Sequence, residues 1–418
     1  MCKYTFLSHI VRYEIVISMV ETNDYDLRII NNLVYFVVSL ILGSLNIIKM
    51  KGRIPMDNGM KIPEYQLFIH PIDLSELRKD IWIDDPVSAK LTINKKKYEI
   101  DIAYRGSHIR DFRKKSYHIS FYKPSTYLNA KEIHLNAEYK DPSLLRNKLS
   151  LDFFNEIGCL SPKSRFVYMK LNGKNEGLYL ELESVDEYFL ANRKLPKGPI
   201  FYAVDGDANF SLMSDLDKEV KKSLKFGYEQ KYGTEQDEFY LQEMIIKINT
   251  ISRAEFENEI VKYLNVEQYL RWLAGVVFTQ NFDGFVHNYA LYQNSETRLF
   301  EVIPWDYDAT WGRDVNGKVM EEDYLRIEGF NTLTARILDV KTFRSQYKNL
   351  LEVILNNQFN VEYLKQKIQG LYDLIRPYIQ KDPYKKDQIH LFDKEPAYIL
   401  DFIEARSKFI KGKLDTLD

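Results

Sequence analysis

Residues 281–312, NFDGFVHNYALYQNSETRLFEVIPWDYDATWG, decide the fold and the chemistry that we expect from this chain. Three acids and an amide, Asp283, Asn288, Asp306 and Asp308, stand here among apolar and aromatic residues. Carboxylates in such surroundings cost free energy unless a cation or a hydrogen-bond donor compensates them. The stretch therefore predicts a metal-bearing site, although Asp283 and Asp306 could instead cap turns around a core.

The spacing of these residues matches a kinase-type site. Protein kinases use a loop Asp to accept the proton of the substrate hydroxyl and an Asn five positions later to hold Mg²⁺. A further Asp, one strand later, holds Mg²⁺ at the nucleotide phosphates. Here Asp283 and Asn288 have that spacing, and LFEVI (299–303) predicts a short buried strand that delivers Asp306. No HRD precedes Asp283 and no DFG stands at Asp306, so the spacing alone does not identify the site.

Further segments carry a resemblance to a known family. Together with 281–312, they are YRGSHIRDFRKKSYHISFY (104–122), DPSLLRNKLSLDFFNEIG (141–158) and GLYLELESVDEYF (177–189). Through these segments the chain resembles the CotH kinase family of Bacillus-type spore formers, from about residue 65 to the C-terminus.

The resemblance implies a fold, a function and a location. The implied fold is α+β, an atypical two-lobed protein-kinase-like architecture with a β-rich N-lobe over 61–204 and a mainly helical C-lobe over 205–418. The implied function is transfer of the γ-phosphoryl group of ATP, with Mg²⁺ or Mn²⁺, to Ser residues of Ser-rich basic spore coat proteins, as a step in outer coat assembly. By the same resemblance, Asp283 matches the catalytic acid and Asp306 the Mg²⁺-binding acid. The protein is then expected in the spore coat, after synthesis in the mother-cell cytoplasm.

The composition fits a soluble globular enzyme. The 418 residues suffice for two or three domain-sized units, and 45% apolar and 14% aromatic residues provide core material. The formal charge of −2 and the pI near 6.4 argue against a dedicated nucleic-acid binder. Cys2 and Cys159 are far apart and form no CxxC, so neither a disulfide framework nor a zinc site is indicated.

Residues 1–60 precede the family-like sequence and differ from it. Leu33 to Ile48, LVYFVVSLILGSLNII, is an uncharged apolar run that is shorter than the roughly 20 residues of a membrane span and lies late for a secretory signal. We interpret these residues as an upstream leader from a mis-called start, with the protein beginning near Met56 or Met60. A membrane anchor is the alternative interpretation.

Residues 85–204 alternate between apolar and polar in the manner of strands. The predicted strands cover 98–105, 115–122, 165–172 and 177–183, with the last two joined at Asn172-Gly173. A helix interrupts them, with Asp141 as its N-cap, Pro142 at its first position and Gly158 as its stop.

From about residue 235 the apolar period becomes helical. The predicted helices cover 266–277, 343–354, 361–375 and 397–411, and Asp283 follows the first of them. Ser252 and Glu255 form a capping box. We interpret the charged segment 205–234 as a solvated surface excursion, with a mobile insertion near the active site as the alternative.

A kinase-like site also needs a Lys for the nucleotide phosphates and a Glu that orients this Lys. Lys114 and Lys115 open the strand 115–122, and we favour Lys115 because it shares the inward face of the strand. Glu183 is the predicted partner, by its match to the family's acid, and Glu181 is the alternative because the register is open. Without the resemblance, basic residues at a strand start would be interpreted as solvated.

The phosphate contacts must differ from those of ordinary kinases, because the chain contains no GxGxxG. Arg105 and Arg110 stand in the turn 105–115, and guanidinium groups can hold phosphate with two hydrogen bonds. We therefore predict that both bind phosphate, with an exposed basic hairpin as the alternative.

The adenine ring needs a flat apolar slot. Trp305, next to Asp306, and Tyr202, at the change from strands to helices, are predicted to stack on opposite sides of the base. Each aromatic could equally belong to the core. Asp308 is a candidate second metal ligand, and a turn cap is the alternative.

Two other functional classes stay open at this point. The chain could be a coat scaffold that binds its clients without turnover. It could also be a different enzyme that uses the same carboxylates, such as a nucleotidyl transferase or a glycosidase. Only the first of these enzymes would need a nucleotide, and it would label its target from the α-phosphate.

Overall fold

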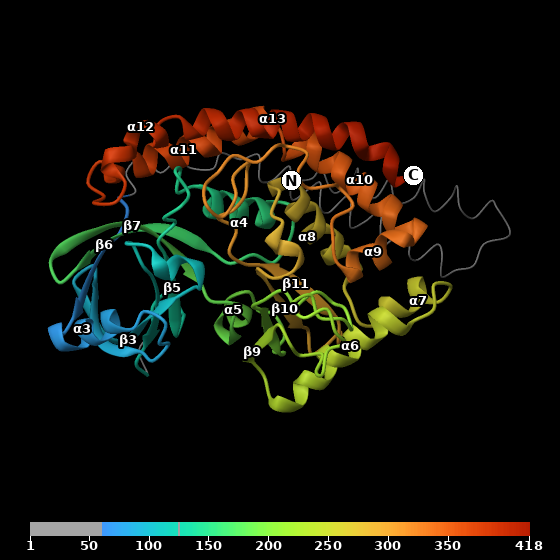
Figure 1. Cartoon of the computed structure of the whole chain (residues 1–418), viewed down its shortest axis with the longest axis horizontal. Coiled ribbons are helices and arrows are strands. Elements are labelled where there is room, and N and C mark those ends of the chain that lie inside the picture. Colours follow the sequence, from blue (N-terminus) through green and yellow to red (C-terminus); the bar gives the residue numbers. More distant parts are fainter. Residues whose placement is uncertain (1–60, 124–125) are drawn as a thin grey trace, which may run out of the picture. The chain divides into compact units, whose positions relative to one another are not determined.

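The computed structural model describes residues 61–123 and 126–418. The leader over 1–60 lies outside the described residues, so its interpretation stays a prediction. Within the described residues, no helix combines the length and the apolar character that a membrane crossing requires. Over 62–418, a β-rich N-terminal region is followed by a mainly helical C-terminal region (Figure 1). The predicted α+β class with this division is confirmed.

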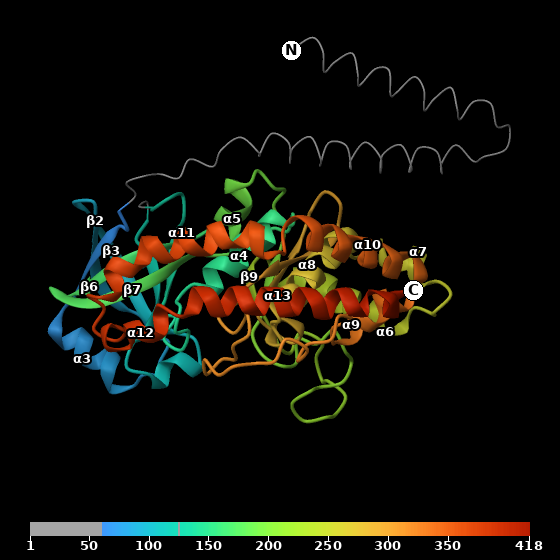
Figure 2. The same cartoon turned by 90° about the horizontal axis from the view of Figure 1, so that it is seen from above.

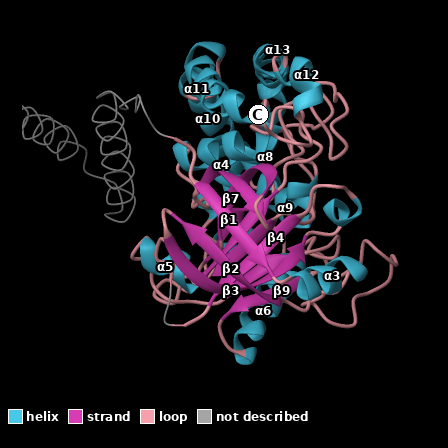
Figure 3. Ribbon diagram, turned by 90° about the vertical axis from the view of Figure 1, so that its left-hand side faces the viewer, coloured by secondary structure: helices cyan, strands magenta, loops and turns pink. Residues whose placement is uncertain are grey.

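The strands of the N-terminal region close into a barrel, whose strands run across the view in Figure 3. Neighbours pair in the order β1-β2-β3-β4-β5-β7-β6, and a parallel pair between β1 and β6 closes the ring. Helix α3 (Pro71–Lys79) connects β1 to β2. The barrel strands are β1 (Glu64–Ile69), β2 (Val87–Ile93), β3 (Lys96–Arg105), β4 (Ser116–Phe121), β5 (Glu132–Asn136), β6 (Ser164–Leu171) and β7 (Lys174–Glu183).

Alternate residues of these strands fill the barrel, because successive side chains of a strand point to opposite faces. In β3 and β4, Ile100, Ile102 and Ile119 are fully buried in the barrel interior together with Tyr104 and Tyr117. The four strands predicted from the sequence correspond to β3, β4, β6 and β7. Those predictions are confirmed.

The turn between β6 and β7 also follows its prediction. Asn172 and Gly173 have φ of 48° and 80°, both in the left-handed region that a two-residue hairpin turn of type I′ requires. The Asn172 side chain accepts a hydrogen bond from the Ile69 backbone N–H at 2.9 Å and donates one to the Ile69 carbonyl at 2.8 Å. The turn is thereby tied to the end of β1.

Helix α4 (Arg146–Glu156) confirms the predicted helix but begins later than expected. Leu144 has φ of 56°, which an α-helix of L-residues does not include. Asp141 is therefore not the N-cap. It closes the turn that precedes the helix, because its carboxylate accepts hydrogen bonds from the backbone N–H groups of Ser143 at 2.8 Å and Arg146 at 3.0 Å.

A second sheet follows the barrel, with antiparallel neighbours in the order β11-β10-β8-β9. Its strands are β8 (Ile200–Ala203), β9 (Tyr228–Tyr232), β10 (Tyr289–Gln293) and β11 (Phe300–Pro304). The chain thus leaves the barrel after Glu183 and enters the second sheet at Ile200. The predicted lobe boundary at residue 204 lies after this change and stays a prediction. The charged segment 205–234 contributes β9 and so is structured in part.

Helices cover the second sheet and extend beyond it. The most deeply buried is α8 (Val266–Thr279), which packs against α4, α10 and β11. Helices α11 and α13 run side by side (Figures 1 and 2). The predicted helices are confirmed in α8, α10, α11 and α13. Besides α8, the helices that follow the barrel are α5 (Glu187–Asn192), α6 (Glu238–Thr250), α7 (Phe256–Ile260), α9 (Thr332–Asp339), α10 (Lys341–Asn357), α11 (Val361–Ile379), α12 (Ile389–Phe392) and α13 (Glu395–Lys413).

The segment between α11 and α12 ties the helical region to the barrel. The fully buried Lys114 amine lies 3.0 Å from the Asp382 carboxylate and also donates to the Leu178 carbonyl. Asp382 accepts a hydrogen bond from the Leu178 N–H at 2.8 Å. Gly177 has φ of 92°, and a Cβ there would lie 2.1 Å from Asp382 Oδ2, so only glycine fits.

Removing one partner of this pair will destabilise the protein more than neutralising both. In Asp382→Asn the Lys114 amine stays buried without an opposite charge, and we expect a loss of about 3–5 kcal/mol in the free energy of unfolding. The double variant Lys114→Met with Asp382→Asn should lose much less. Urea unfolding of the variants measures this difference.

The control is Lys90→Met, which removes one partner of an ion pair whose side chains are 59% exposed on each side. We expect this change to cost at most about 1 kcal/mol. An Asp382→Asn variant as stable as this control would contradict a stabilising role for the buried pair.

Candidate active site

The hairpin of β10 and β11 brings the predicted metal ligands together. Tyr289 at the start of β10 pairs with Pro304 at the end of β11, so Asn288 and Asp306 flank the same end of the hairpin. The Asn288 side chain donates from Nδ2 to the Asp306 carbonyl at 3.1 Å, and the Trp305 N–H donates to the Asn288 carbonyl at 3.0 Å. The two predicted ligands are therefore neighbours.

Asp283 lies on the short turn that follows α8. The helix ends at Thr279, the φ of 59° at the following Gln280 reverses the chain direction, and a single 3₁₀ turn begins at Asp283. Burial raises the pKa of the Asp283 carboxyl, the nearby His287 lowers it, and the negative charge of Asp306 raises it further. Asp283 and Asp306 are thus close enough to interact through their charges.

Asp308 and a further acid, Glu138, complete an acidic cluster with Asp306. Burial raises the pKa of Asp308 well above its usual range, and the Asp306 charge adds to this effect. Burial likewise raises the pKa of Glu138, with Asp308 as the next cause. Glu138 Oε1 accepts a hydrogen bond from Asn147 at 3.0 Å, but the buried Oε2 has no partner among the described residues. The cluster therefore contains more carboxyl groups than the surrounding protein supplies with cations, and burial disfavours their charged forms.

This donor set fits a divalent cation of the Mg²⁺ type. Among residues 61–123 and 126–418, no three His, Cys, Asp or Glu side chains converge closely enough to hold a metal ion alone. Mg²⁺ in phosphate-transfer sites binds through one or two carboxylates and completes its shell with phosphate oxygens and water. Buried carboxylates with raised pKa and an unpartnered oxygen are what such a cation would compensate.

Arg105 reaches the acidic cluster from the end of β3. Its guanidinium donates to Asn136 Oδ1, and Asn136 Nδ2 donates to Asp306 Oδ1 at 3.3 Å. The guanidinium also lies 5.4 Å from the centre of the Trp305 ring. Burial lowers the pKa of Arg105, and the charge of Asp306 opposes this shift. Arg105 is thus a predicted phosphate ligand that the structure brings to the site.

The structure brings the two aromatics of the predicted adenine sandwich together, and their stacking on the base stays a prediction. The ring centres of Tyr202 and Trp305 are 5.1 Å apart, with ring planes at 58°. Aromatic rings in direct contact have centres about 4.5–7 Å apart, so these two rings touch each other in this structure. The Tyr202 hydroxyl accepts a hydrogen bond from the Val185 N–H at 2.8 Å. Trp305 lies at the site, and Tyr202 supports it from the side.

The other predicted phosphate ligands are engaged elsewhere. The Lys115 amine donates to the Arg110 carbonyl. The Arg110 guanidinium pairs with Asp84 and donates to the Gly106 carbonyl at 2.6 Å, so it holds its own loop together. Lys114 is committed to the buried pair described above. The Lys114, Lys115 and Arg110 side chains, which we predicted as phosphate ligands, are thus bonded to other groups of the protein in this structure.

The predicted ion pair between Lys115 and Glu183 is wrong. Glu183 pairs with Arg193 at 2.7 Å. The alternative, Glu181, pairs with Arg165 at 2.9 Å. Both carboxylates therefore already have Arg partners.

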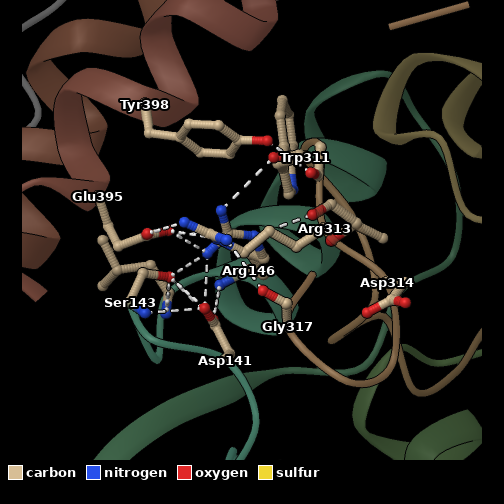
Figure 4. A network of polar contacts seen from close by, with 12 residues as sticks. Asp141, Ser143, Arg146, Trp311, Arg313, Asp314, Gly317, Glu395 and Tyr398 are labelled. Carbon is tan, nitrogen blue, oxygen red and sulfur yellow. Dashed lines mark hydrogen bonds and ion pairs between the residues drawn. The ribbon is translucent and has the colours of Figure 1, made fainter. Parts of the chain in front are cut away.

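Behind the acidic cluster, a buried network fixes the segment that carries it (Figure 4). The Arg146 guanidinium of α4 pairs with Asp141 at 2.6 Å and with Glu395 of α13 at 2.8 Å, and it donates to the Thr310 carbonyl at 2.9 Å. Arg313 donates from Nε to the same Glu395 at 3.1 Å. The segment after Asp306 and Asp308 is thus anchored to two helices.

The site also contains side chains of β5 that sequence reasoning missed. Ile133 and Leu135 point into the barrel interior, so Glu132, His134 and Asn136 occupy the opposite face of the strand. The imidazole of His134 meets the Trp305 ring edge to face at 5.2 Å. Alternation in EIHLN was the available signal, but five residues are short for assigning a face.

Glu132 lies at the far end of this face, away from the acidic cluster. Its carboxylate pairs with Lys231 of β9 at 2.5 Å and accepts a hydrogen bond from the Ser184 hydroxyl at 2.6 Å. Nε2 of His118 lies 3.4 Å from the Glu132 carboxylate. The His118 ring also stacks on the His134 ring, with ring centres 5.2 Å apart. Burial raises the pKa of Glu132, but the hydrogen bond with His118 and the charge of Lys231 outweigh this effect and hold the pKa far below its usual range.

Comparison with known proteins gives a consistent family match. The family model described as CotH kinase protein matches residues 102–410. The chain is 65% identical over 362 residues to "Inner spore coat protein H" of Bacillus subtilis (strain 168), covering 87% of this chain and 100% of that protein. It is 30% identical over 311 residues to "Inner spore coat protein H-like protein" of the same organism, covering 73% and 87%.

One solved structure, the proinflammatory kinase CtkA of Helicobacter pylori, is similar only at a low level. The TM-score is 0.27 and the sequence identity 13%, over 70% of this chain and 95% of that chain. A likeness of this size carries no argument about fold or activity. The resemblance that the sequence indicated is confirmed by the family match.

Neutralising one acid of the cluster will stabilise the protein in the absence of divalent metal. A raised pKa means that the folded protein binds the proton more tightly than the unfolded chain. The carboxylates therefore cost stability as the pH rises above about 4. In EDTA, Asp308→Asn should melt at a higher temperature than the wild type at pH 7.5, and by a smaller margin at pH 5. Thermal unfolding followed by circular dichroism measures both margins.

Mg²⁺ or Mn²⁺ should then raise the melting temperature of the wild type at pH 7.5 more than that of Asp308→Asn. Asp373→Asn, a change at an exposed site on α11, serves as the control and should leave both values unchanged. A lower melting temperature for Asp308→Asn at both pH values would contradict an uncompensated cluster.

Proposed function

Because the chain belongs to the CotH kinase family, we propose that it is a protein kinase that transfers the γ-phosphoryl group of ATP to Ser residues of other coat proteins. The relative with 65% identity is named an inner spore coat protein, so we assign the chain to the spore coat. Synthesis in the mother-cell cytoplasm, Ser-rich basic substrates and a role in outer coat assembly extend this proposal.

The observation that carries the proposal is a chain of hydrogen bonds that joins Arg105 of the barrel, through Asn136, to Asp306, which Asn288 also contacts. Asp283 and Asp308 lie near enough to Asp306 for its charge to raise the pKa of both carboxyls. Phosphoryl transfer demands mainly that phosphates be positioned and their charge neutralised, with one group to accept a proton. A guanidinium beside carboxylates supports that chemistry.

Asp283 is the proposed general base. It would align the hydroxyl of the acceptor Ser and take its proton as the new bond to the γ-phosphorus forms and the bond between that phosphorus and the ADP leaving group breaks. Burial and the nearby Asp306 charge raise the pKa of Asp283, although His287 opposes them. A higher pKa makes a carboxylate a stronger base, provided that it stays ionised at the working pH.

Asp306 and Asp308 are the proposed metal ligands, with Glu138 behind them. Asn288 donates through its Nδ2 to the Asp306 carbonyl, which leaves its Oδ1 as a further oxygen ligand. When bound, Mg²⁺ or Mn²⁺ would neutralise charge on the phosphates that these residues face. The network around Arg146 keeps the acid-bearing segment in place.

Arg105 is the proposed phosphate ligand, in place of Lys114, Lys115 and Arg110. Its guanidinium presents several donors, and the bond to Asn136 orients it beside Asp306. Trp305 offers one ring for contact with the nucleoside.

Loss of either acid should abolish phosphate transfer without unfolding the protein. With γ-labelled ATP and a Ser-rich coat protein as acceptor, Asp283→Asn should lower the rate about 10²–10⁴-fold, because it removes the base. Asp306→Asn should lower the rate at least as much. Label incorporation and mass spectrometry of phosphoserine measure the effect, and Asp373→Asn should retain wild-type activity.

Unchanged transfer in both acid variants would sink the assignment. Label that arrives from α-labelled ATP would point to a nucleotidyl transferase instead. Binding of the coat protein with no label from either nucleotide would point to a scaffold.

Arg105 and Lys115 can be separated directly. Arg105→Met should lower kcat/KM for ATP by about 100-fold, because a charged hydrogen-bonding partner of phosphate is worth on the order of 3 kcal/mol. Lys115→Met should leave kcat/KM within about threefold of the wild type, since its amine bonds only a local carbonyl. The opposite ranking would restore Lys115 as the phosphate ligand.

A further inference from the structure

The excursion between β8 and β9, residues 204–227, begins at the end of the second sheet that holds the candidate active site. Ala203, the last residue of β8, pairs with Tyr289 of β10, and Asn288 directly precedes Tyr289. The Tyr289 hydroxyl donates to the Ala208 carbonyl at 2.6 Å. The excursion is therefore fixed at its base beside Asn288, and it projects from the rest of the described chain as the light-green loop of Figure 2.

Residues 211–222 of this excursion form a hairpin that is held by its own backbone and by buried polar groups. The Ser214 N–H donates to the Glu219 carbonyl at 2.8 Å. The Asp207 carboxylate accepts a hydrogen bond from the Ser214 hydroxyl at 3.0 Å, and the Lys221 ammonium donates to the Asp207 carbonyl. These three polar side chains, Asp207, Ser214 and Lys221, are all buried. The hairpin thus has a defined conformation that does not depend on its apolar side chains.

The apolar side chains of the hairpin lie on the outside. Met213 is 44% exposed, Leu216 67% and Val220 70%. Removing apolar surface from water is the main favourable contribution to folding, so large apolar side chains are usually inside and Lys and Asp outside. This hairpin does the reverse, because Asp207 and Lys221 are the buried residues. A group of large apolar side chains that a fixed element presents to solvent is typical of an interaction site.

The charges at the tip of the hairpin indicate the kind of partner. Residues 215–219 expose the three acids Asp215, Asp217 and Glu219 and one cation, Lys218. The Lys218 amine lies 3.5 Å from the Asp215 carboxylate in an exposed contact, which binds weakly. An acidic surface with apolar side chains is complementary to a protein segment that combines Lys or Arg with apolar residues. The acceptor under the proposed function is basic, and it must reach the active site beside which the hairpin is anchored.

We propose that the 211–222 hairpin is a docking site for the acceptor coat protein, outside the sequence that is phosphorylated. Leu216 and Val220 contact an apolar part of that protein, and the acids of the tip meet its Lys or Arg side chains. The inference rests on the proposed function and adds a contact that the phosphoryl-transfer residues do not make. Docking raises the local concentration of acceptor Ser at the active site and leaves the chemical step as it is.

The test measures two acceptors with the double variant Leu216→Ser with Val220→Ser. One acceptor is the full-length Ser-rich basic coat protein, and the other is a short synthetic peptide around one of its phosphorylated Ser residues. For the full-length protein, KM should rise about tenfold at unchanged kcat, because two apolar side chains lose their contact. For the peptide, which lacks the docking segment, both constants should stay at wild-type values.

The matched control is Ile72→Ser with Val353→Ser, on α3 and α10. These side chains are 70% and 51% exposed, so the same change in chemistry is made away from the hairpin. The control should leave KM and kcat at wild-type values with both acceptors. An equal rise of KM in the control would show a general effect of lost surface apolarity and would overturn the proposal.

Other results also decide the matter. An unchanged KM for the full-length acceptor in the hairpin variant would overturn the proposal, and so would an equal rise for the short peptide. If sedimentation velocity shows a wild-type dimer that the hairpin variant dissociates, a second copy of the chain covers the hairpin and the proposal falls. If the wild type transfers no label, the proposed function fails. Biolayer interferometry with the full-length coat protein then tests docking by itself, since the hairpin variant should still bind more weakly than the wild type.

A measurement on the wild type covers the case in which the hairpin variant does not fold. In hydrogen–deuterium exchange, the backbone amides of 211–222 should exchange more slowly when the full-length coat protein is added. The short peptide should leave their exchange unchanged. Unchanged exchange at a saturating concentration of the full-length protein would overturn the proposal.

Discussion

The structure depends on a simple constraint at β5, where a strand must send successive side chains to opposite faces. One face completes the barrel interior with Ile133 and Leu135. The other face meets Trp305 and the second sheet with Glu132, His134 and Asn136. A shift of one residue in register would put a carboxylate and an imidazole into the barrel and two aliphatic chains into the site. The fold of the barrel and the chemistry of the site are therefore specified by the same five residues.

Buried charge is treated in two ways in this molecule. At two structural places it is paired with opposite charge: Lys114 with Asp382, and Arg146 with Asp141 and Glu395. Where the acids Asp306, Asp308 and Glu138 gather, the protein supplies fewer opposite charges than carboxylates, and burial raises the pKa of Asp308 and Glu138. Such an imbalance costs stability, and functional sites are where proteins tolerate that cost.

The part of the site that could be predicted from the sequence is the part that lies close together in the chain. Asp283, Asn288 and Asp306 belong to one loop and one hairpin, so their proximity follows from local structure. The partners of Lys114 and Glu183 could not be predicted in this way. The partner of Lys114 is 268 residues away. Arg193 follows Glu183 by only 10 residues, but the two meet through the turn between β7 and α5, which the apolar pattern does not describe. Apolar periodicity predicted the strands and helices well, but it carries no information on which distant charges meet.

The buried pair of Lys114 and Asp382 also bears on how the chain is made. Synthesis delivers the barrel strands first, and domains begin to fold as they leave the ribosome. A nascent barrel holds the Lys114 ammonium without its carboxylate until residue 382 has emerged, after more than half of the chain has followed. This element therefore reaches its final stability only late in synthesis, and a chain cut short ahead of Asp382 will lack the carboxylate that neutralises the Lys114 ammonium. Ribosomal stalling in the helical region would expose the unfinished barrel to proteolysis.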